Sequence, residues 1–172
     1  GNPIVRFALQ LAPLTFPRPV ELRGAEWAEI DFDNARWNIP ANRMKMRLPH
    51  IIPLSRQAIE ILVQVQKISG NGKYVFPSAW TTSKTISENT INFALRRLGY
   101  SSDKQTGHGF RSMASTLLNE MKYDRDNIEK QLAHVDGGVR GAYNEAEWLE
   151  DRRDMMQEWA DFIYRLKAEA AE

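Results

Sequence analysis

The sequence has 172 residues and a formal net charge of +1, with 42% hydrophobic and 26% charged residues. This length predicts one domain with a sizeable core, and this composition excludes wholesale disorder. No apolar run reaches the roughly 18 residues of a membrane span, and no secretory pattern opens the chain. The absence of cysteine excludes disulfides, thiolate metal sites and cysteine nucleophiles, and it fits a reducing compartment. We expect the chain to start partway into a longer protein.

Charge is distributed unevenly along the chain. Residues 1–142 carry 19 Lys and Arg against 13 Asp and Glu, which gives +6, whereas residues 143–172 carry 4 against 9, which gives −5. A basic body suits contact with a polyanion, and an acidic tail suits contact with protein. Scattered solvated charge would give the same counts, so charge alone does not decide between the two interpretations.

The N-terminal part predicts two helices followed by a small sheet. Apolar residues at helical spacing cover residues 4–14, and the prolines that follow force a break. A short second helix is expected to begin at Pro19, because proline is favoured in a first turn. Two short runs, 27–32 and 36–39, predict a β-hairpin, and residues 50–54 are expected to add a third strand.

The rest of the chain predicts mainly helices. Ser55 is a suitable N-cap for a helix ending near Gly70, and Ser87 for one that runs to Leu98. Further helices are expected over residues 108–121, 126–133 and 146–166. The last is acidic and carries an apolar stripe, which would pack either on its own body or on a neighbouring subunit. The stripe consists of Trp148, Met155, Trp159 and Phe162. The predicted class is therefore α+β, mainly α-helical, with a small three-stranded antiparallel sheet.

A His-x-x-Arg pair is the most informative local pattern. His108 and Arg111 share a face at the start of a predicted helix, where free N–H groups and the helix dipole favour an anion. The arginine fork can hold two phosphate oxygens while the histidine donates to another. Taken alone, such a pair is more often an ordinary surface feature. No metal-ligand cluster or glycine-rich phosphate motif accompanies it, so no metal or other cofactor is expected.

Five motifs follow one another in a defined order along the chain. They are residues 16–23, the basic run 43–47 before residues 50–55, residues 108–111, residues 132–134, and Tyr143. This order resembles the tyrosine recombinase family, particularly its prophage-type integrases, over nearly the whole chain. The resemblance implies a mainly helical catalytic domain that cleaves and rejoins DNA without metal or ATP. The family's N-terminal DNA-binding domain has no counterpart in this sequence, so we expect weak DNA binding.

The resemblance assigns roles to individual residues. Arg18 and Arg111 would clamp the scissile phosphate, because cationic side chains must stabilise its developing charge where no metal does. His108 and His134 would be further donors or proton handlers. Tyr143 would attack phosphorus to form a 3′-phosphotyrosine. Taken alone, without the resemblance, it would be interpreted as a structural tyrosine after a glycine-rich loop.

Further roles depend on residues around these five motifs. Lys45 is the expected general acid for the departing 5′-oxygen, with Arg43 and Arg47 as alternatives in the same basic run. Glu21 would support the first arginine by pairing with it. Arg43, Arg47 and His50 are expected contacts to the DNA backbone.

The implied partner is double-stranded DNA, bound by a homotetramer on two DNA sites when the protein is full length. The expected setting is the bacterial cytoplasm, at the nucleoid, with no membrane contact. Two alternatives remain open at this point: a topoisomerase of type IB that uses the same phosphotyrosine chemistry, and a non-catalytic DNA-binding module of the same fold.

Overall fold

The structure is a computed structural model that describes residues 1–134 and 148–171. Its helices are α1 (Pro3–Thr15), α2 (Pro19–Arg23), α3 (Arg56–Ser69), α4 (Thr90–Arg97), α5 (Gly109–Glu120), α6 (Arg125–Gln131) and α7 (Leu149–Glu169). Its strands are β1 (Ile30–Asp31), β2 (Arg36–Ile39) and β3 (His50–Pro53), which pair antiparallel in the order β1-β2-β3. The predicted class, mainly helical with one small antiparallel sheet, is confirmed. Among the described residues, every helix is too short or too polar to span a bilayer.

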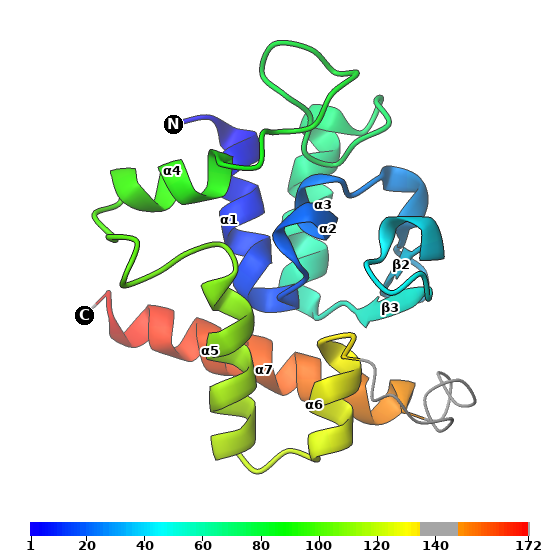
Figure 1. Ribbon diagram of the computed structural model, residues 1–172, viewed down its shortest axis with the longest axis vertical. Helices are drawn as coiled ribbons and strands as arrows, with labels where there is room; N and C mark the ends of the chain where they lie inside the picture. Colours follow the sequence, from blue (N-terminus) through cyan, green and yellow to red (C-terminus); the bar gives the residue numbers. More distant parts are fainter. Residues whose placement is uncertain (135–147, 172) are drawn as a thin grey trace.

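Helix α1 lies at the centre of the molecule. It contacts α3, α4, α5 and α7, and the small sheet lies to one side of this helical body (Figure 1). The side chain of Asn2 caps its first turn by accepting from the Ile4 N–H at 2.8 Å. The helix ends at Phe16, whose φ of 33° turns the chain toward α2, as the proline pattern predicted. Buried Ala8 and Leu11 form part of the core at this helix.

The first strand is shorter than the hydrophobic run predicted. Residues Trp27–Glu29 form a 3₁₀ turn, and strand pairing begins only with Ile30 opposite Trp37. The reason is that the Glu29 carboxylate points inward, where its Oε2 accepts from the Trp37 indole N–H at 2.9 Å. The two later strands pair in the predicted way, with His50 opposite Ile39.

Helix α4 begins later than its sequence predicted. The hydroxyl of Ser87 contacts the Thr90 hydroxyl at 2.9 Å instead of capping a backbone N–H, and Asn89 occupies the N-cap position. Ser55, in contrast, caps α3 as predicted, by accepting from the Ala58 N–H at 3.2 Å. Beyond α4, Gly99 adopts a φ of 90°, a conformation that favours glycine after a helix.

The apolar stripe of α7 packs on the body of its own chain. Met155 and Trp159 are fully buried, and the Trp159 indole N–H donates to the carbonyl of Pro13 in α1 at 2.8 Å. The same indole meets the Phe16 ring edge-on, with the ring centroids 6.1 Å apart. These contacts use the apolar face of the helix, so in this structure the stripe packs in cis.

Candidate active site

A cavity of about 360 Å³ lies where the start of α2, the first turns of α5 and the turn after α6 meet. It is lined by Arg18, His108, Arg111, Ser112, Ser115, Thr116, Leu132 and His134. The four residues expected to hold the phosphate, which span positions 18 to 134, are thus brought to one cavity. The two serines and the threonine were not expected there, although their spacing from His108 and Arg111 places them on the same face of α5.

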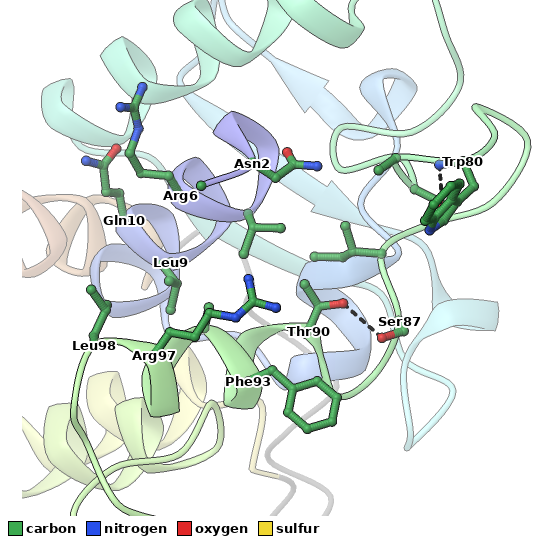
Figure 2. A pocket seen from close by; sticks show the side chains of 16 residues that line it. Asn2, Arg6, Leu9, Gln10, Trp80, Ser87, Thr90, Phe93, Arg97 and Leu98 are labelled. Carbon is green, nitrogen blue, oxygen red and sulfur yellow. Dashed lines mark hydrogen bonds between the residues drawn. The ribbon is translucent and has the colours of Figure 1, made fainter.

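A second, larger cavity of about 760 Å³ has no such chemistry. It lies between the start of α1, helix α4 and the loop of residues 78–87, and Figure 2 shows apolar side chains such as Leu9 and Phe93 beside Arg6 and Arg97. Of the residues expected to be catalytic, none of those that the structure describes lines it. The volume of a cavity therefore does not identify the candidate active site here. The smaller cavity is the candidate active site, because the expected residues line it.

Arg18 is fixed by the carboxylate of Glu21 three residues later. The guanidinium Nη1 lies 3.0 Å from Glu21 Oε1, and the backbone N–H of Arg18 donates to Oε2 at 2.9 Å. Pro19 follows at the first helical position and presets the backbone angle there. Glu21 itself is buried, with 1% of its surface exposed, so its charge is directed at Arg18. The pairing expected from the sequence is present.

Arg111 is buried at the base of the same cavity. Its Nη1 donates to the carbonyl of Phe16 at 2.9 Å and its Nη2 to the carbonyl of Leu132 at 2.6 Å. Burial and the nearby charge of Arg18 lower the pKa of Arg111 to about 10, which still leaves it protonated at neutral pH. The two guanidinium groups thus form a strongly positive site, only partly offset by Glu21, in which an anion is favoured.

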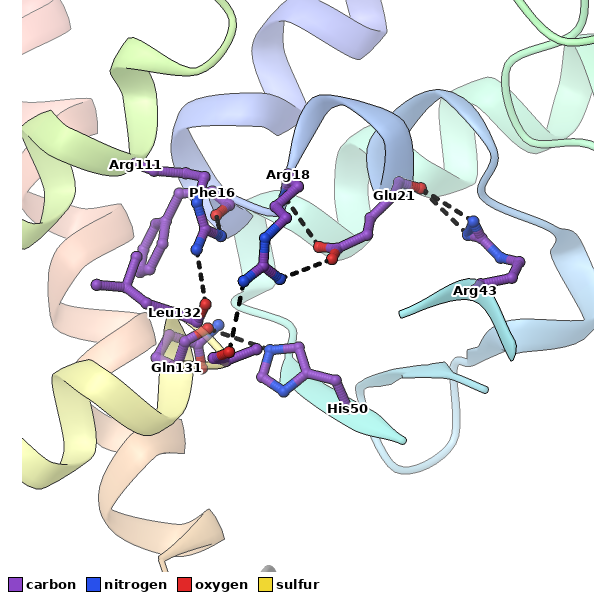
Figure 3. A network of polar contacts seen from close by, with 9 residues as sticks. Phe16, Arg18, Glu21, Arg43, His50, Arg111, Gln131 and Leu132 are labelled. Carbon is purple, nitrogen blue, oxygen red and sulfur yellow. Dashed lines mark hydrogen bonds and ion pairs between the residues drawn. The ribbon is translucent and has the colours of Figure 1, made fainter. Parts of the chain in front are cut away.

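The turn after α6 supplies the acceptors for these cations. Ala133 has a φ of 53°, its N–H donates to the carbonyl of Lys130, and the N–H of His134 donates to the carbonyl of Glu129. This pairing closes the helix end and leaves the carbonyls of residues 131, 132 and 133 free for other donors. They accept from His50, Arg111 and Arg18 respectively, with the last contact at 3.5 Å (Figure 3).

Replacing Ala133 with glycine is expected to raise the free energy of unfolding by about 0.5–1 kcal/mol, because an L-residue pays a steric cost in the left-handed region that glycine avoids. Ala94, in the interior of α4, is the matched control, and its change to glycine should lower the same quantity by about 1 kcal/mol. Urea unfolding of the two variants measures the difference. Equal destabilisation by both changes would contradict the strain at Ala133.

The two histidines of the cavity are held differently. His134 Nδ1 lies 2.7 Å from Glu129 Oε2, and 49% of its side chain is exposed. Since a carboxylate accepts, Nδ1 carries the proton of the neutral ring, so Nε2 is an acceptor in that form and donates to a phosphate only when the ring is protonated. His108 is exposed at the N-cap position of α5. Both line the same cavity as the two arginines.

Arg43 has a structural role and not the expected one in DNA binding. Its Nε and Nη2 donate to the two carboxylate oxygens of Glu29, at 2.6 and 3.0 Å, and Nη2 also donates to the carbonyl of Glu21 at 3.1 Å. Only 17% of its side chain is exposed. The sequence shows that Arg43 is a cation, but it does not show that the buried Glu29 carboxylate accepts its hydrogen bonds.

His50 is also misassigned as a contact to the DNA backbone. It is 6% exposed, and its ring Nε2 donates to the carbonyl of Gln131 at 3.1 Å, which fixes the proton on Nε2. Burial and the charge of Arg152 lower the pKa of His50 to about 3, so the ring is neutral at physiological pH. A buried neutral ring has no means of pairing with a phosphate in solvent.

Replacing His50 with glutamine should flatten the dependence of stability on pH. An unfolded histidine takes up a proton near pH 6.5, whereas the folded one does so only near pH 3, so wild-type stability falls as pH falls through this interval. The loss approaches about 1.4 kcal/mol per pH unit, or about 2 kcal/mol between pH 6.5 and pH 5. Urea unfolding at both pH values checks this. His108→Gln, at an exposed position, should keep the wild-type slope, and an unchanged slope in His50→Gln would contradict the burial argument.

Two further candidates that the structure describes, Lys45 and Arg47, are not among the residues that line the cavity. Lys45 is exposed on the loop between β2 and β3. Arg47, on the same loop, is exposed and donates to the carbonyl of Asn42 at 3.3 Å, so it remains a candidate for the DNA backbone. Tyr143 lies outside the described residues. The assignments of Lys45 and Tyr143 therefore stay predictions from the sequence.

Comparison with known proteins identifies the family of the chain. The sequence profile described as the phage integrase family matches residues 4–148. The chain belongs to this family. It is 45% identical to the integrase of Enterobacteria phage P4, over 95% of this chain and 41% of that protein. It is 46% identical to the prophage integrase IntZ of Escherichia coli K12, over 95% of this chain and 40% of that protein. The resemblance to tyrosine recombinases inferred from five motifs is confirmed.

Solved structures of integrases and recombinases share the fold. The integrase of mycobacterium phage Brujita superposes with a TM-score of 0.67 at 15% identity, covering 91% of this chain and 52% of that one. The XerA recombinase gives a TM-score of 0.58 at 16% identity, covering 79% and 54%. At these identities the likeness concerns the fold alone. The integrase-family chain described here spans about two-fifths of the length of the curated relatives named above.

Proposed function

We propose that this integrase-family chain is the catalytic domain of a site-specific recombinase, which cleaves and rejoins DNA through a 3′-phosphotyrosine intermediate to integrate or excise mobile DNA. The observation that carries the proposal is the single cavity lined by Arg18, Arg111, His108 and His134. Two guanidinium groups held by backbone carbonyls provide a preorganised site for a phosphate whose charge grows in the transition state. The family to which the chain belongs supports the same reaction.

Each proposed step assigns a bond and a proton. The Tyr143 oxygen forms a bond to phosphorus, the bond from phosphorus to the 5′-oxygen breaks, and the 3′-phosphate remains attached to the enzyme. The phenol gives its proton to a neutral histidine of the cavity, His108 or His134, as it attacks, assisted by the positive field of Arg18 and Arg111. Lys45 supplies a proton to the departing 5′-oxygen. Rejoining reverses these steps with a 5′-hydroxyl from the same or another strand.

The substrate of the proposed reaction is double-stranded DNA at the nucleoid of a bacterial host, and Arg47 is a candidate backbone contact. The net charge of +6 over residues 1–142 supports attraction to DNA, although it is modest for tight binding. Segments that the longer relatives have in addition would then contribute to affinity and to the choice of site. In the full-length protein, four copies act on two DNA sites.

A nicked suicide substrate tests the proposal. The full-length protein is incubated, in the presence of EDTA, with nicked duplexes tiled across the DNA that flanks its gene. The nick lets the short 5′-hydroxyl strand diffuse away after cleavage, so the covalent adduct accumulates and resists SDS. We expect an adduct on the duplex that contains the recombination site, and little on the intact duplex of the same sequence. Specific DNA binding without any adduct would instead support a non-catalytic module.

A further inference from the structure

We propose that His50, Gln131 and Arg152 form a positioning network that sets the turn after α6, and through it the two arginines of the cavity. The network rests on the proposed function, because it specifies residues that position that same site. None of the three residues lines the cavity, so their effect on the reaction is indirect.

The network joins three elements that are far apart in the sequence. His50 on β3 donates to the carbonyl of Gln131 at the end of α6, at 3.1 Å. Arg152, in the first turn of α7, donates through Nε and Nη2 to Oε1 of the Gln131 side chain, at 3.1 and 2.8 Å. The same arginine donates to the carbonyl of Ile51 on β3. Gln131 is therefore held at its backbone by the sheet and at its side chain by α7.

Buried polar groups with this geometry are specific in a way that apolar packing is not. Gln131 and Arg152 are each 1% exposed, and His50 is 6% exposed. A buried guanidinium is costly unless its donors are matched, so the arrangement favours one position of the three elements relative to one another. An apolar trio of the same volume would stabilise the fold without fixing the α6 carbonyls in direction.

Gln131 is directly followed in the sequence by the two residues whose carbonyls accept from Arg111 and Arg18. Leu132, the next residue, accepts from Arg111, and Ala133 accepts from Arg18. Figure 3 shows His50, Gln131, Leu132 and the two arginines converging on this one turn. A shift of the turn moves both cations, and a misplacement of about 1 Å can cost as much as 10²-fold in rate. Gln131 and Arg152 also bracket, in the sequence, the segment that carries Tyr143.

Two variants of His50 test the network. His50→Phe keeps a ring of similar size but removes the donor to the Gln131 carbonyl, whereas His50→Gln keeps a donor at comparable reach. With the full-length protein and the nicked duplex, we expect His50→Phe to lower the single-turnover rate of adduct formation about 10-fold or more. Its DNA affinity should change less than about twofold, since no network residue lines the cavity. His50→Gln should recover most of the rate.

A matched control separates positioning from loss of stability. Leu95 is buried in α4, away from the network, and Leu95→Ala is expected to cost at least as much thermal stability as His50→Phe. All rates are measured well below the melting temperature of every variant. The control should keep the wild-type rate, and an equal loss of rate in Leu95→Ala and His50→Phe would overturn the network.

A readout without catalysis keeps this test distinct from that of the proposed function. In the same full-length protein labelled with ¹⁵N-arginine, the Nε–Hε signal of Arg111 should shift or broaden in His50→Phe and stay at the wild-type position in His50→Gln and Leu95→Ala. An unmoved signal in His50→Phe would overturn the network whether or not the wild type forms an adduct. If the wild type forms no adduct while the signal moves as expected, the proposed function fails and the positioning of Arg111 stands.

Discussion

Replacing Tyr143 with phenylalanine is expected to abolish the covalent protein–DNA adduct while DNA affinity stays within about twofold of wild type. Only the hydroxyl is removed, so the contacts that bind the duplex remain. An ordinary tyrosine has a pKa near 10, and about one molecule in 10³ is ionised at neutral pH, so the proposed attack would depend on the positive field that Arg18 and Arg111 create. Adduct formation on the nicked duplex and a binding titration measure the two quantities separately.

Tyr100→Phe is the matched control for this change. Tyr100 is half exposed beyond α4 and does not line the candidate active site, so its loss of a hydroxyl should leave adduct formation unchanged. An adduct that persists in Tyr143→Phe would remove Tyr143 from the mechanism. Loss of DNA binding to the same extent as loss of the adduct would give Tyr143 a structural role instead.

Replacing Arg111 with lysine is expected to lower the rate of adduct formation about 10²- to 10³-fold, although the positive charge is kept. The rigid fork of arginine donates to the carbonyls of Phe16 and Leu132 while its charge still faces the phosphate. Lysine lacks this fork and cannot do both. The expected loss therefore arises from geometry and not from charge. Single-turnover kinetics at saturating protein measure it.

The control for this substitution is Arg97→Lys on α4. Arg97 lines the larger cavity and is exposed, so the same chemical change there should alter the rate less than about twofold. Urea unfolding of both variants shows whether Arg111→Lys remains folded at the temperature of the assay. A wild-type rate in folded Arg111→Lys would show that charge alone is enough and would contradict the proposed clamp.

The sequence predicted those features that depend on neighbours in the chain. The N-cap of α3, the break after α1 and the pair of Arg18 with Glu21 all involve residues within a few positions of one another. Their geometry follows from backbone rules and from the reach of a side chain to the next turn. The order of the five motifs predicted which residues belong to one site. Nothing in their spacing showed how the fold would bring these residues together.

The sequence could not show where long-range acceptors lie. Arg43 and His50 are donors in a basic segment, and both were expected to face DNA. The structure shows that Glu29 and the Gln131 carbonyl occupy them instead. Each acceptor belongs to another element, and a carbonyl carries no sequence signal at all. The role of Arg152 was missed for the same reason, because its acceptors on α6 and β3 become neighbours only on folding.

The most direct test of the account is to identify the residue that carries DNA in the trapped adduct. The adduct is digested with nuclease and then with trypsin, and cleavage after Arg140 and Arg152 releases residues 141–152, which contain Tyr143 as their single tyrosine. We expect mass spectrometry to find the residual nucleotide on Tyr143. A nucleotide attached to any other residue would contradict it.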